Sequence, residues 1–298
     1  MVDSPGAPEL SRIRLWWLAA RPATLAASVA PVLAAVALAT AVGRVRAWAG
    51  VAALLVALAI QVGVNYANDY SDHRRGADRE RRGPVRAAAS GLVSPGSVRL
   101  AAIIAFAIAA VSGLALSLLT DPRLIFLGAA AILAAWLYTG GPRPYGYIGL
   151  GEVFTFIFFG LVATAGTVYV LLLQIPPETW WLASALGCMA CAILGVNNLR
   201  DIESDRRAGK MTLAARLGRR GTRVEVGLLL GVGVLAPVVA ALLYHRPFLL
   251  LALLAAPLGL RVVIGSGETE PARLVGALRQ TAAMELWLAL LIALGLLI

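Results

Sequence analysis

Long apolar runs separated by short polar segments are the main pattern of this chain. A helix needs roughly 20 apolar residues to cross a bilayer, and runs near that length recur along the whole sequence. The pattern predicts an all-α, polytopic membrane protein with about nine crossings. The predicted crossings are 22–43, 47–67, 98–119, 123–138, 149–174, 179–198, 224–244, 247–264 and 280–298. The run at 123–138 is short and the run at 149–174 is long, so eight or ten crossings are alternatives.

Residues 1–298 are predicted to form one transmembrane domain, in which about the first 15 residues are a polar tail. This tail has no apolar stretch followed by a small-residue cleavage site, so no signal peptide is expected. The composition agrees with a membrane protein, because 60% of the residues are hydrophobic and 14% are charged. A soluble core does not require so large an apolar fraction.

The basic residues indicate how the chain crosses the membrane. The net charge is +10, which could suggest a nucleic-acid partner, but the distribution argues against one. With nine crossings and a cytoplasmic N-terminus, 22 of the 26 basic residues fall on the cytoplasmic side; the exceptions are Arg44, Arg46, Arg123 and Arg246. The positive-inside rule therefore predicts a cytoplasmic N-terminus and an outside C-terminus, with long cytoplasmic loops at 68–97 and 199–223.

Two acidic clusters occur where apolar runs end. The first contains Asn68, Asp69, Asp72 and Asp78, and the second contains Asn197, Asp201 and Asp205. Gln61, Asn65, Asn68 and Asp72 are spaced by four, three and four residues, so they form one polar stripe on a helix. For one cluster alone, hydrogen bonds between helices, helix capping or pairing with arginine would be equally good explanations.

The repetition of the pattern favours a functional site. Asp72 and Asp201 each follow an Asn by four residues, each ends an apolar run, and each precedes an arginine-rich segment. Asp201 and Asp205 form a like-charged pair on a helix, which needs a nearby cation such as Arg200, Arg206 or Mg²⁺. Two similar helical units facing one cavity would bring the clusters together. Hard oxygen ligands suit Mg²⁺ bound to a diphosphate, and the apolar surroundings suggest that a polyisoprenyl lipid carries this diphosphate.

Other motifs add little. Cys188 and Cys191 form a C-x-x-C inside an apolar run, where a packing role is the better explanation. The two histidines, His73 and His245, are far apart in the sequence.

Five segments of this chain resemble the UbiA superfamily of intramembrane prenyltransferases. They are RPATL (21–25), NYANDYSDHRRGAD (65–78), GPVRAAASGLVSP (83–95), YTGGPRPYGYIGLGEVFTFIFFG (138–160) and NNLRDIESDRRAGKMTLAARLG (197–218). They are most similar to the branch that prenylates 1,4-dihydroxy-2-naphthoate in menaquinone synthesis. The resemblance implies a nine-helix bundle around a central cavity that opens to the cytoplasm, in a multi-pass protein of the plasma membrane. Many members have an acid at the position of Gly76, so the role of the nearby Asp78 is the least certain.

The resemblance also implies roles for individual residues. A site of two Mg²⁺ ions would be bound by five carboxylates, those of Asp69, Asp72, Asp78, Asp201 and Asp205. The catalytic candidates are the same residues without Asp78. Substrate-binding candidates are Arg21, Asn65, Asn68, Arg86, Tyr138, Tyr145, Asn197 and Lys210.

Alternatives stay open for several of these residues. Arg86 and Lys210 would contact the diphosphate or be ordinary cytoplasmic charges. Tyr138 and Tyr145 would cap the cavity or anchor the protein at the interface. Arg21 would bind the acceptor carboxylate or snorkel to the interface. Glu152 and Glu285 lie in or near predicted helices; Glu152 would remove a proton or pair with an arginine.

The expected reaction is Mg²⁺-dependent transfer of a polyprenyl group from an allylic polyprenyl diphosphate to 1,4-dihydroxy-2-naphthoate. It would release CO₂ and diphosphate and give demethylmenaquinol. Rival acceptors are 4-hydroxybenzoate, homogentisate, haem or a phosphosugar. A cation-coupled transporter is a rival from another class, but the acids lie at the ends of the predicted spans and not at their middle.

Overall fold

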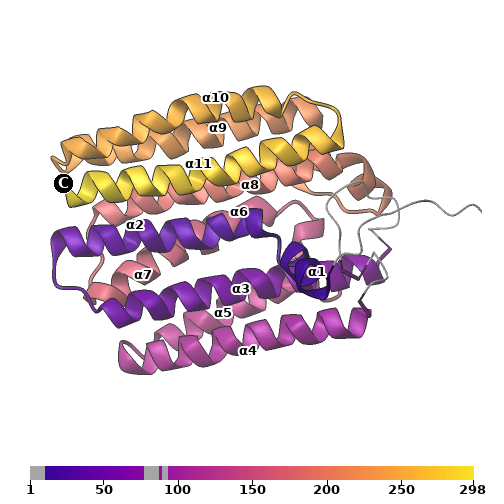
Figure 1. The fold of residues 1–298 in the computed structure, drawn as a ribbon, viewed down its shortest axis with the longest axis horizontal. Helices are drawn as coiled ribbons and strands as arrows, with labels where there is room; N and C mark the ends of the chain where they lie inside the picture. Colours follow the sequence, from indigo (N-terminus) through magenta and orange to yellow (C-terminus); the bar gives the residue numbers. More distant parts are fainter. Residues whose placement is uncertain (1–10, 77–86, 89–92) are drawn as a thin grey trace, which may run out of the picture.

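The computed structural model describes residues 11–76, 87–88 and 93–298 as a bundle of long helices. The helices run nearly side by side, with their ends at the left and right of the bundle in Figure 1. Their bounds are α1 (Arg12–Ala19), η1 (Pro22–Leu25), α2 (Ala26–Val42), α3 (Ala47–Arg74), α4 (Pro95–Leu119), α5 (Leu124–Leu137), η2 (Tyr145–Tyr147), α6 (Gly151–Thr155), η3 (Phe156–Val162), α7 (Ala163–Leu172), α8 (Glu178–Arg207), α9 (Leu213–Leu243), η4 (Pro247–Ala255), α10 (Ala256–Gly265) and α11 (Pro271–Leu297).

The predicted crossings correspond to helices in this part of the chain. Eight described helical segments are long and apolar enough to span a bilayer. The ninth, α5, has 14 residues, and its length of about 21 Å is less than the hydrocarbon thickness of about 30 Å. The all-α, membrane-spanning architecture predicted from the hydropathy pattern is confirmed, and the short run at 123–138 corresponds to α5, which is too short by itself to be counted with the eight spans.

The helices continue beyond the apolar runs at the end of the bundle that carries the acidic clusters. The run that ends at 67 belongs to α3, which continues to Arg74, and α8 continues to Arg207. On the other side of the second cluster, α9 begins at Leu213 and is kinked at Gly218. Most of the predicted loop 199–223 is therefore helical, and residues 68–74 of the predicted loop 68–97 belong to α3. Hydropathy marks the apolar part of a helix, and the helix itself continues into polar sequence.

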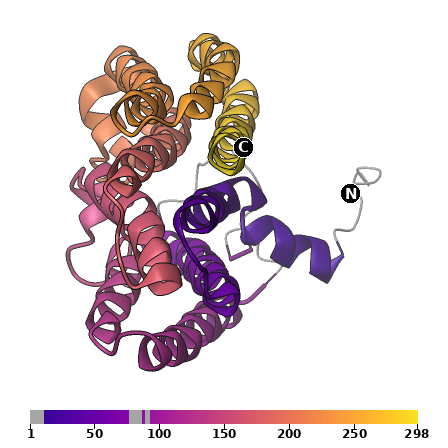
Figure 2. The ribbon, with the colours of Figure 1, turned by 90° about the vertical axis from the view of Figure 1, so that its left-hand side faces the viewer.

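Two groups of helices share α2 and α8 as a common wall. In the end-on view of Figure 2, the orange and yellow helices α9, α10 and α11 lie on one side of α2 and α8, and α3, α4 and α5 lie on the other. The first group packs into a solid apolar core with fully buried side chains such as Leu186, Met189, Met284 and Leu288. The second group, together with the segment from α6 to α7, surrounds a cavity.

The segment from α6 to α7 is a continuous helix with a π-helical middle, η3. Its cavity-lining residues form adjacent pairs that repeat every four positions: Phe154 and Thr155, Phe158 and Phe159, Val162 and Ala163, Gly166 and Thr167. An α-helical repeat of 3.6 residues would turn this face away from the cavity within a few turns. The wider π turn keeps one face directed at the cavity along its whole length.

Candidate functional site

One cavity, with a volume of about 280 Å³, lies between α2, α3, α4, α5, the α6–α7 segment and α8. One end is polar and contains Asn68, Asp72, Asn197, Asp201 and Lys210. The remaining wall is mostly alanine, leucine, valine and phenylalanine. The cavity therefore combines a charged end with an apolar slot, the combination that a lipid with an ionised head group needs.

Lys210 connects the two acidic clusters. Its Nζ lies 3.9 Å from Asp72 Oδ2 and 3.8 Å from Asp205 Oδ1. Because both distances end on the same nitrogen, the two carboxylate oxygens are no further apart than their sum, 7.7 Å. A turn at Gly209, whose φ is +72°, returns the chain so that the Lys210 amide donates to the Asp205 carbonyl. Acids that are far apart in the sequence thus meet at one end of the bundle.

Asp201 forms a two-pronged ion pair with its neighbour Arg200. Arg200 Nε lies 2.8 Å from Asp201 Oδ1, and Arg200 Nη2 lies 2.7 Å from Asp201 Oδ2. The same Nη2 donates to Asn197 Oδ1 at 3.0 Å. All three residues come from the last turns of α8, and Arg200 and Asp201 are buried. Arg200 therefore supplies the positive charge that offsets repulsion between Asp201 and Asp205.

Asp69 faces a different partner from Asp72. Its Oδ2 accepts a hydrogen bond of 2.8 Å from the amide of Ala87, and its Oδ1 accepts one of 3.4 Å from the amide of Ala88. These bonds tie the end of α3 to a segment 18 residues later in the chain. Asp69 does not line the cavity, so the geometry gives it a clear structural role beside the predicted metal role.

The asparagines of the polar stripe join α3 to its neighbours. Asn65 Nδ2 donates to the Ala20 carbonyl at 2.8 Å and to Thr24 Oγ1 at 2.9 Å. Asn68 Oδ1 accepts from Thr139 Oγ1 at 2.7 Å. Both asparagines still border the cavity. Both asparagines therefore form the hydrogen bonds between segments that were considered as an explanation for one acidic cluster alone. They also lie at the predicted substrate site.

Aromatic rings form a row from the polar end into the cavity. The Tyr138 and Tyr145 rings meet edge to face at 5.4 Å, Tyr145 stacks on Phe154 at 4.0 Å, and Phe154 and Phe158 are nearly parallel with centroids 6.3 Å apart. Burial raises the pKa of Tyr145, so this phenol remains neutral. Of the two roles considered for the tyrosines, the geometry favours the cavity wall. Phe154 and Phe158 were not predicted; their signal was the aromatic repeat FTFIFF.

Tyr147 is a site residue that the sequence analysis missed. Its hydroxyl donates to Asp72 Oδ1 at 2.8 Å. The Arg75 guanidinium and the Lys210 ammonium lie over its ring at 5.2 and 5.3 Å. Burial, followed by the negative charge of Asp72, raises the pKa of Tyr147. Nothing in the residue pattern separates it from Tyr145, because only the turn of η2 directs it to Asp72.

Arg21 and Glu152 also border or approach the cavity. Arg21 lines it from the residue before η1, where its φ of 52° is left-handed. Glu152 Oε1 accepts from Asn198 Nδ2 at 3.3 Å, so its partner is an amide and not the arginine considered from the sequence. Asn198, which was not predicted, lines the cavity. Glu285 is fully buried in α11, among the core residues and away from the cavity lining.

Two predicted residues, Asp78 and Arg86, lie outside the described residues. In the described ranges, no three acidic, histidine or cysteine side chains come close enough together to hold a metal ion by themselves. Proteins usually bind Mg²⁺ through one or two carboxylates together with substrate phosphate oxygens and water, and the carboxylates at the polar end suit that arrangement.

Known proteins resemble this chain over nearly its whole length. It is 46% identical over 278 residues to a 1,4-dihydroxy-2-naphthoate octaprenyltransferase of Mycobacterium tuberculosis, covering 91% of this chain and 93% of the relative. It is 35% identical to the protein of the same name from Escherichia coli, covering 97% and 96%.

Solved structures share the fold at low sequence identity. A UbiA homologue from Archaeoglobus fulgidus bound to DMAPP and Mg²⁺ superimposes with a TM-score of 0.64 at 15% identity, covering 94% of this chain and 99% of the homologue. The apo UbiA homologue from Aeropyrum pernix gives 0.66 at 16% identity, covering 90% and 96%. The sequence model of the UbiA prenyltransferase family matches residues 28–288 of this chain. This chain, with two acidic helix ends converging on an apolar cavity, belongs to the UbiA prenyltransferase family.

Proposed function

We propose that this protein transfers a polyprenyl group from an allylic polyprenyl diphosphate to 1,4-dihydroxy-2-naphthoate. The products are demethylmenaquinol, CO₂ and diphosphate, as in menaquinone biosynthesis. The relatives named 1,4-dihydroxy-2-naphthoate octaprenyltransferase support this acceptor. The single observation that carries the proposal is the position of Lys210 between Asp72 and Asp205, at the mouth of a cavity with an apolar wall.

The polar end has the chemistry of a Mg²⁺–diphosphate site. Its oxygen donors are carboxylates and amides, which are the hard ligands that Mg²⁺ prefers. We assign Asp72, Asp201 and Asp205 as ligands in a site of two ions, with Asn68 and Asn197 beside them; Asp69 and Asp78 are further candidates. Bound Mg²⁺ would neutralise the negative charge that develops on the departing diphosphate.

The side chains around this end assist departure of the diphosphate. When the allylic C–O bond breaks, the electron pair leaves with the diphosphate oxygen, and a cation next to that oxygen stabilises the transition state. Lys210 lines the polar end of the cavity, which supports it as this cation, and Arg86 is a second candidate. Tyr147 holds Asp72 through its hydroxyl.

The apolar part of the cavity protects the allylic cation from water. Tyr138, Tyr145, Phe154 and Phe158 present ring faces or edges along one wall, and electron-rich rings attract cations. The acceptor ring carbon that bears the carboxylate forms the new C–C bond. The C–CO₂ bond then breaks, and its electron pair restores the aromatic ring. We assign Arg21, which lines the cavity, to bind the acceptor carboxylate before CO₂ leaves.

The membrane orientation completes the proposal. We infer that the protein lies in the plasma membrane with its N-terminus in the cytoplasm and its C-terminus outside. Both acidic helix ends lie at one end of the bundle in Figure 1, and the C-terminus lies at the other. The charge distribution supports a cytoplasmic location for the acidic end, so both substrates would be supplied from the cytoplasm and the bilayer.

Prenyl transfer by the purified protein tests the proposal. EDTA should abolish product formation and added Mg²⁺ should restore it, while Asp72→Ala and Asp201→Ala should each lower kcat by roughly 100-fold or more. Asp121→Asn is the matched control, because this acid pairs with the exposed Arg123 away from the cavity; its activity should be unchanged. Wild-type turnover that survives chelation would overturn the metal assignment. A panel of hydroxylated aromatic acceptors would show whether another compound replaces the naphthoate.

A further inference from the structure

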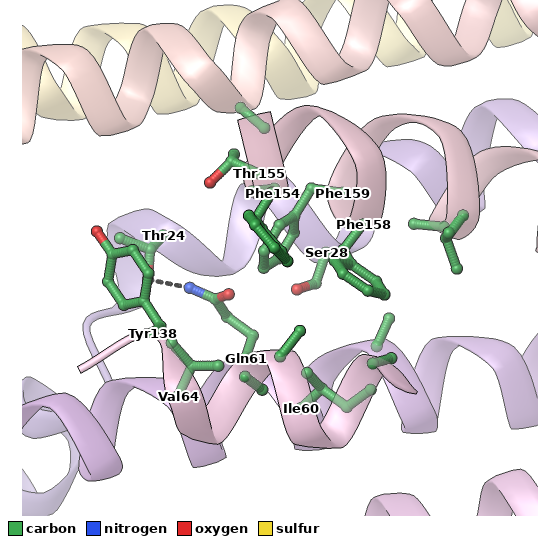
Figure 3. A pocket seen from close by; sticks show the side chains of 18 of the residues that line it. Thr24, Ser28, Ile60, Gln61, Val64, Tyr138, Phe154, Thr155, Phe158 and Phe159 are labelled. Atoms are coloured by element: carbon green, nitrogen blue, oxygen red, sulfur yellow. Dashed lines mark hydrogen bonds between the residues drawn. The ribbon is translucent and has the colours of Figure 1, made fainter. Parts of the chain in front are cut away.

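Two buried polar atoms face the apolar part of the cavity and have no hydrogen-bond partner in the part of the chain that the structure describes. Ser28 on α2 and Gln61 on α3 are 1% and 6% exposed, and both line the cavity. Among the described residues, neither Ser28 Oγ nor Gln61 Oε1 has a hydrogen-bond partner. Figure 3 shows both groups pointing into the space between α3 and the helix that carries Phe154 and Phe158. Buried polar atoms in proteins are nearly always satisfied, so this pair indicates a ligand.

Thr24 fixes the orientation of the Gln61 amide. The Thr24 hydroxyl has a single proton, which it donates to the Arg21 carbonyl at 2.9 Å. Towards the amides of α3 it can therefore only accept, and it accepts from Gln61 Nε2 at 2.8 Å and from Asn65 Nδ2 at 2.9 Å. This arrangement requires Gln61 to present its NH₂ group to Thr24 and to turn its carbonyl oxygen into the cavity.

The opposite wall is aromatic and flat. Phe154 and Phe158 lie nearly parallel, with an angle of 19° between their rings. The π turn of η3 keeps both rings on the cavity face. The space therefore has a polar wall formed by Ser28 and Gln61 and a ring-lined wall formed by the two phenylalanines. A planar aromatic ligand with a hydroxyl group fits both walls, whereas a prenyl chain offers no hydrogen bond to the polar one.

The pair is also too deep to contact the diphosphate. Gln61 precedes Asp72 by 11 residues on the same helix, which corresponds to about 16 Å along α3. When the diphosphate is at Asp72, Gln61 and Ser28 meet whatever part of the substrates lies further into the cavity.

We infer that Ser28 and Gln61 form the hydroxyl-recognition subsite for the aromatic acceptor, with Gln61 Oε1 accepting a hydrogen bond from a ring hydroxyl and Ser28 Oγ completing the contact. This inference rests on the proposed function and names its specificity residues. The subsite selects the dihydroxy form of the ring, because an oxidised quinone has no O–H to donate to Gln61.

Kinetics of two small substitutions test the subsite. Ser28→Ala and Gln61→Met remove the polar atoms with little change of volume, and each should raise the KM for 1,4-dihydroxy-2-naphthoate roughly 10-fold. The KM for the polyprenyl diphosphate should stay within about 2-fold. The matched control is Ser117→Ala: Ser117 lines the same cavity, but its hydroxyl already donates to the Gly113 carbonyl at 2.7 Å, so both KM values should be unchanged.

An acceptor analogue supplies the second arm. 1-Hydroxy-2-naphthoate lacks the hydroxyl at position 4, and its binding is measured by competition with the diol; wild type should bind it more weakly than the diol, and Gln61→Met should reduce this preference. If both variants keep the wild-type thermal midpoint and acceptor KM, the inference is overturned. A rise in the KM for the diphosphate alone would also overturn it, because the pair would then line the path of the prenyl chain. If wild type instead uses another hydroxylated aromatic acid, and the two variants impair that reaction, the subsite stands while the proposed acceptor fails.

Discussion

At the scale of single residues, the site depends on a few carboxylates that are held in place by neighbouring hydroxyl, ammonium and guanidinium groups. Asp72 receives both the Tyr147 hydroxyl and the Lys210 ammonium. Asp201 receives the Arg200 guanidinium. Hydrogen bonds and ion pairs of this kind fix the position of a carboxylate before any ligand arrives, which lowers the reorganisation needed during reaction.

Tyr147→Phe removes one of these bonds and keeps the ring over which Arg75 and Lys210 lie. We expect kcat/KM for the polyprenyl diphosphate to fall roughly 10-fold. Burial and the charge of Asp72 raise the pKa of Tyr147, so the phenol donates at every pH below that raised value and the bond is lost only above it. The fall should therefore be the same at about pH 6 and about pH 9. An effect of the substitution that disappears at about pH 9 would contradict this assignment.

The sequence predicted some of these residues and could not have predicted others. Asp72 and Asp201 were accessible because spacing on a helix and repetition of a pattern are local properties, whereas Lys210 became a candidate only through the resemblance to the family. Tyr147, Ser28 and Asn198 were not, because their roles arise only when separate helices meet. Gln61 was placed on the polar stripe, but its free carbonyl oxygen depends on a hydrogen bond to Thr24, 37 residues earlier.

At the scale of elements, apolar runs predicted which helices exist and located their lipid-embedded parts. They did not give the helix ends, because α3, α8 and α11 continue into charged sequence. The π-helical η3 was also inaccessible, since its local sequence FIFFGLV is compatible with an ordinary helix. Tertiary packing explains it: Gly160 lies directly against α8 at Gly187.

Gly160→Ala tests the importance of this contact. A Cβ at Gly160 would lie 2.6 Å from Gly187 Cα and 2.8 Å from the Ala183 carbonyl oxygen, and both are backbone atoms that cannot rotate away. The cost of overpacking is typically about 1–3 kcal/mol, so the thermal midpoint of the detergent-solubilised protein should fall by several degrees. Gly231→Ala is the control, because a Cβ there meets no atom within 4 Å. An unchanged midpoint in Gly160→Ala would show that η3 is free to move away from α8.

At the scale of the whole molecule, the fold separates stability from chemistry. The group formed by α8 to α11 with α2 is a continuous apolar core, while the group formed by α3 to α7 surrounds the cavity. Helix α8, like α2, belongs to both groups: its buried leucines face the core, and Asn197 and Asp201 face the cavity. Because the polar end of the cavity lies at one end of the bundle, the orientation of the bundle in the membrane decides which compartment supplies the substrates.

Cysteine labelling in intact cells tests that orientation. Arg123 and Arg143 are exposed and lie at opposite ends of α5, and the native Cys188 and Cys191 are buried, so they should give little background. With a cytoplasmic N-terminus, a membrane-impermeant maleimide should label Arg123→Cys in intact cells and Arg143→Cys only after permeabilisation. The reverse pattern would place the acidic helix ends outside. Because Arg143 lies in the loop between Tyr138 and Tyr145 at the charged end of the cavity, the same measurement also decides from which side the diphosphate enters.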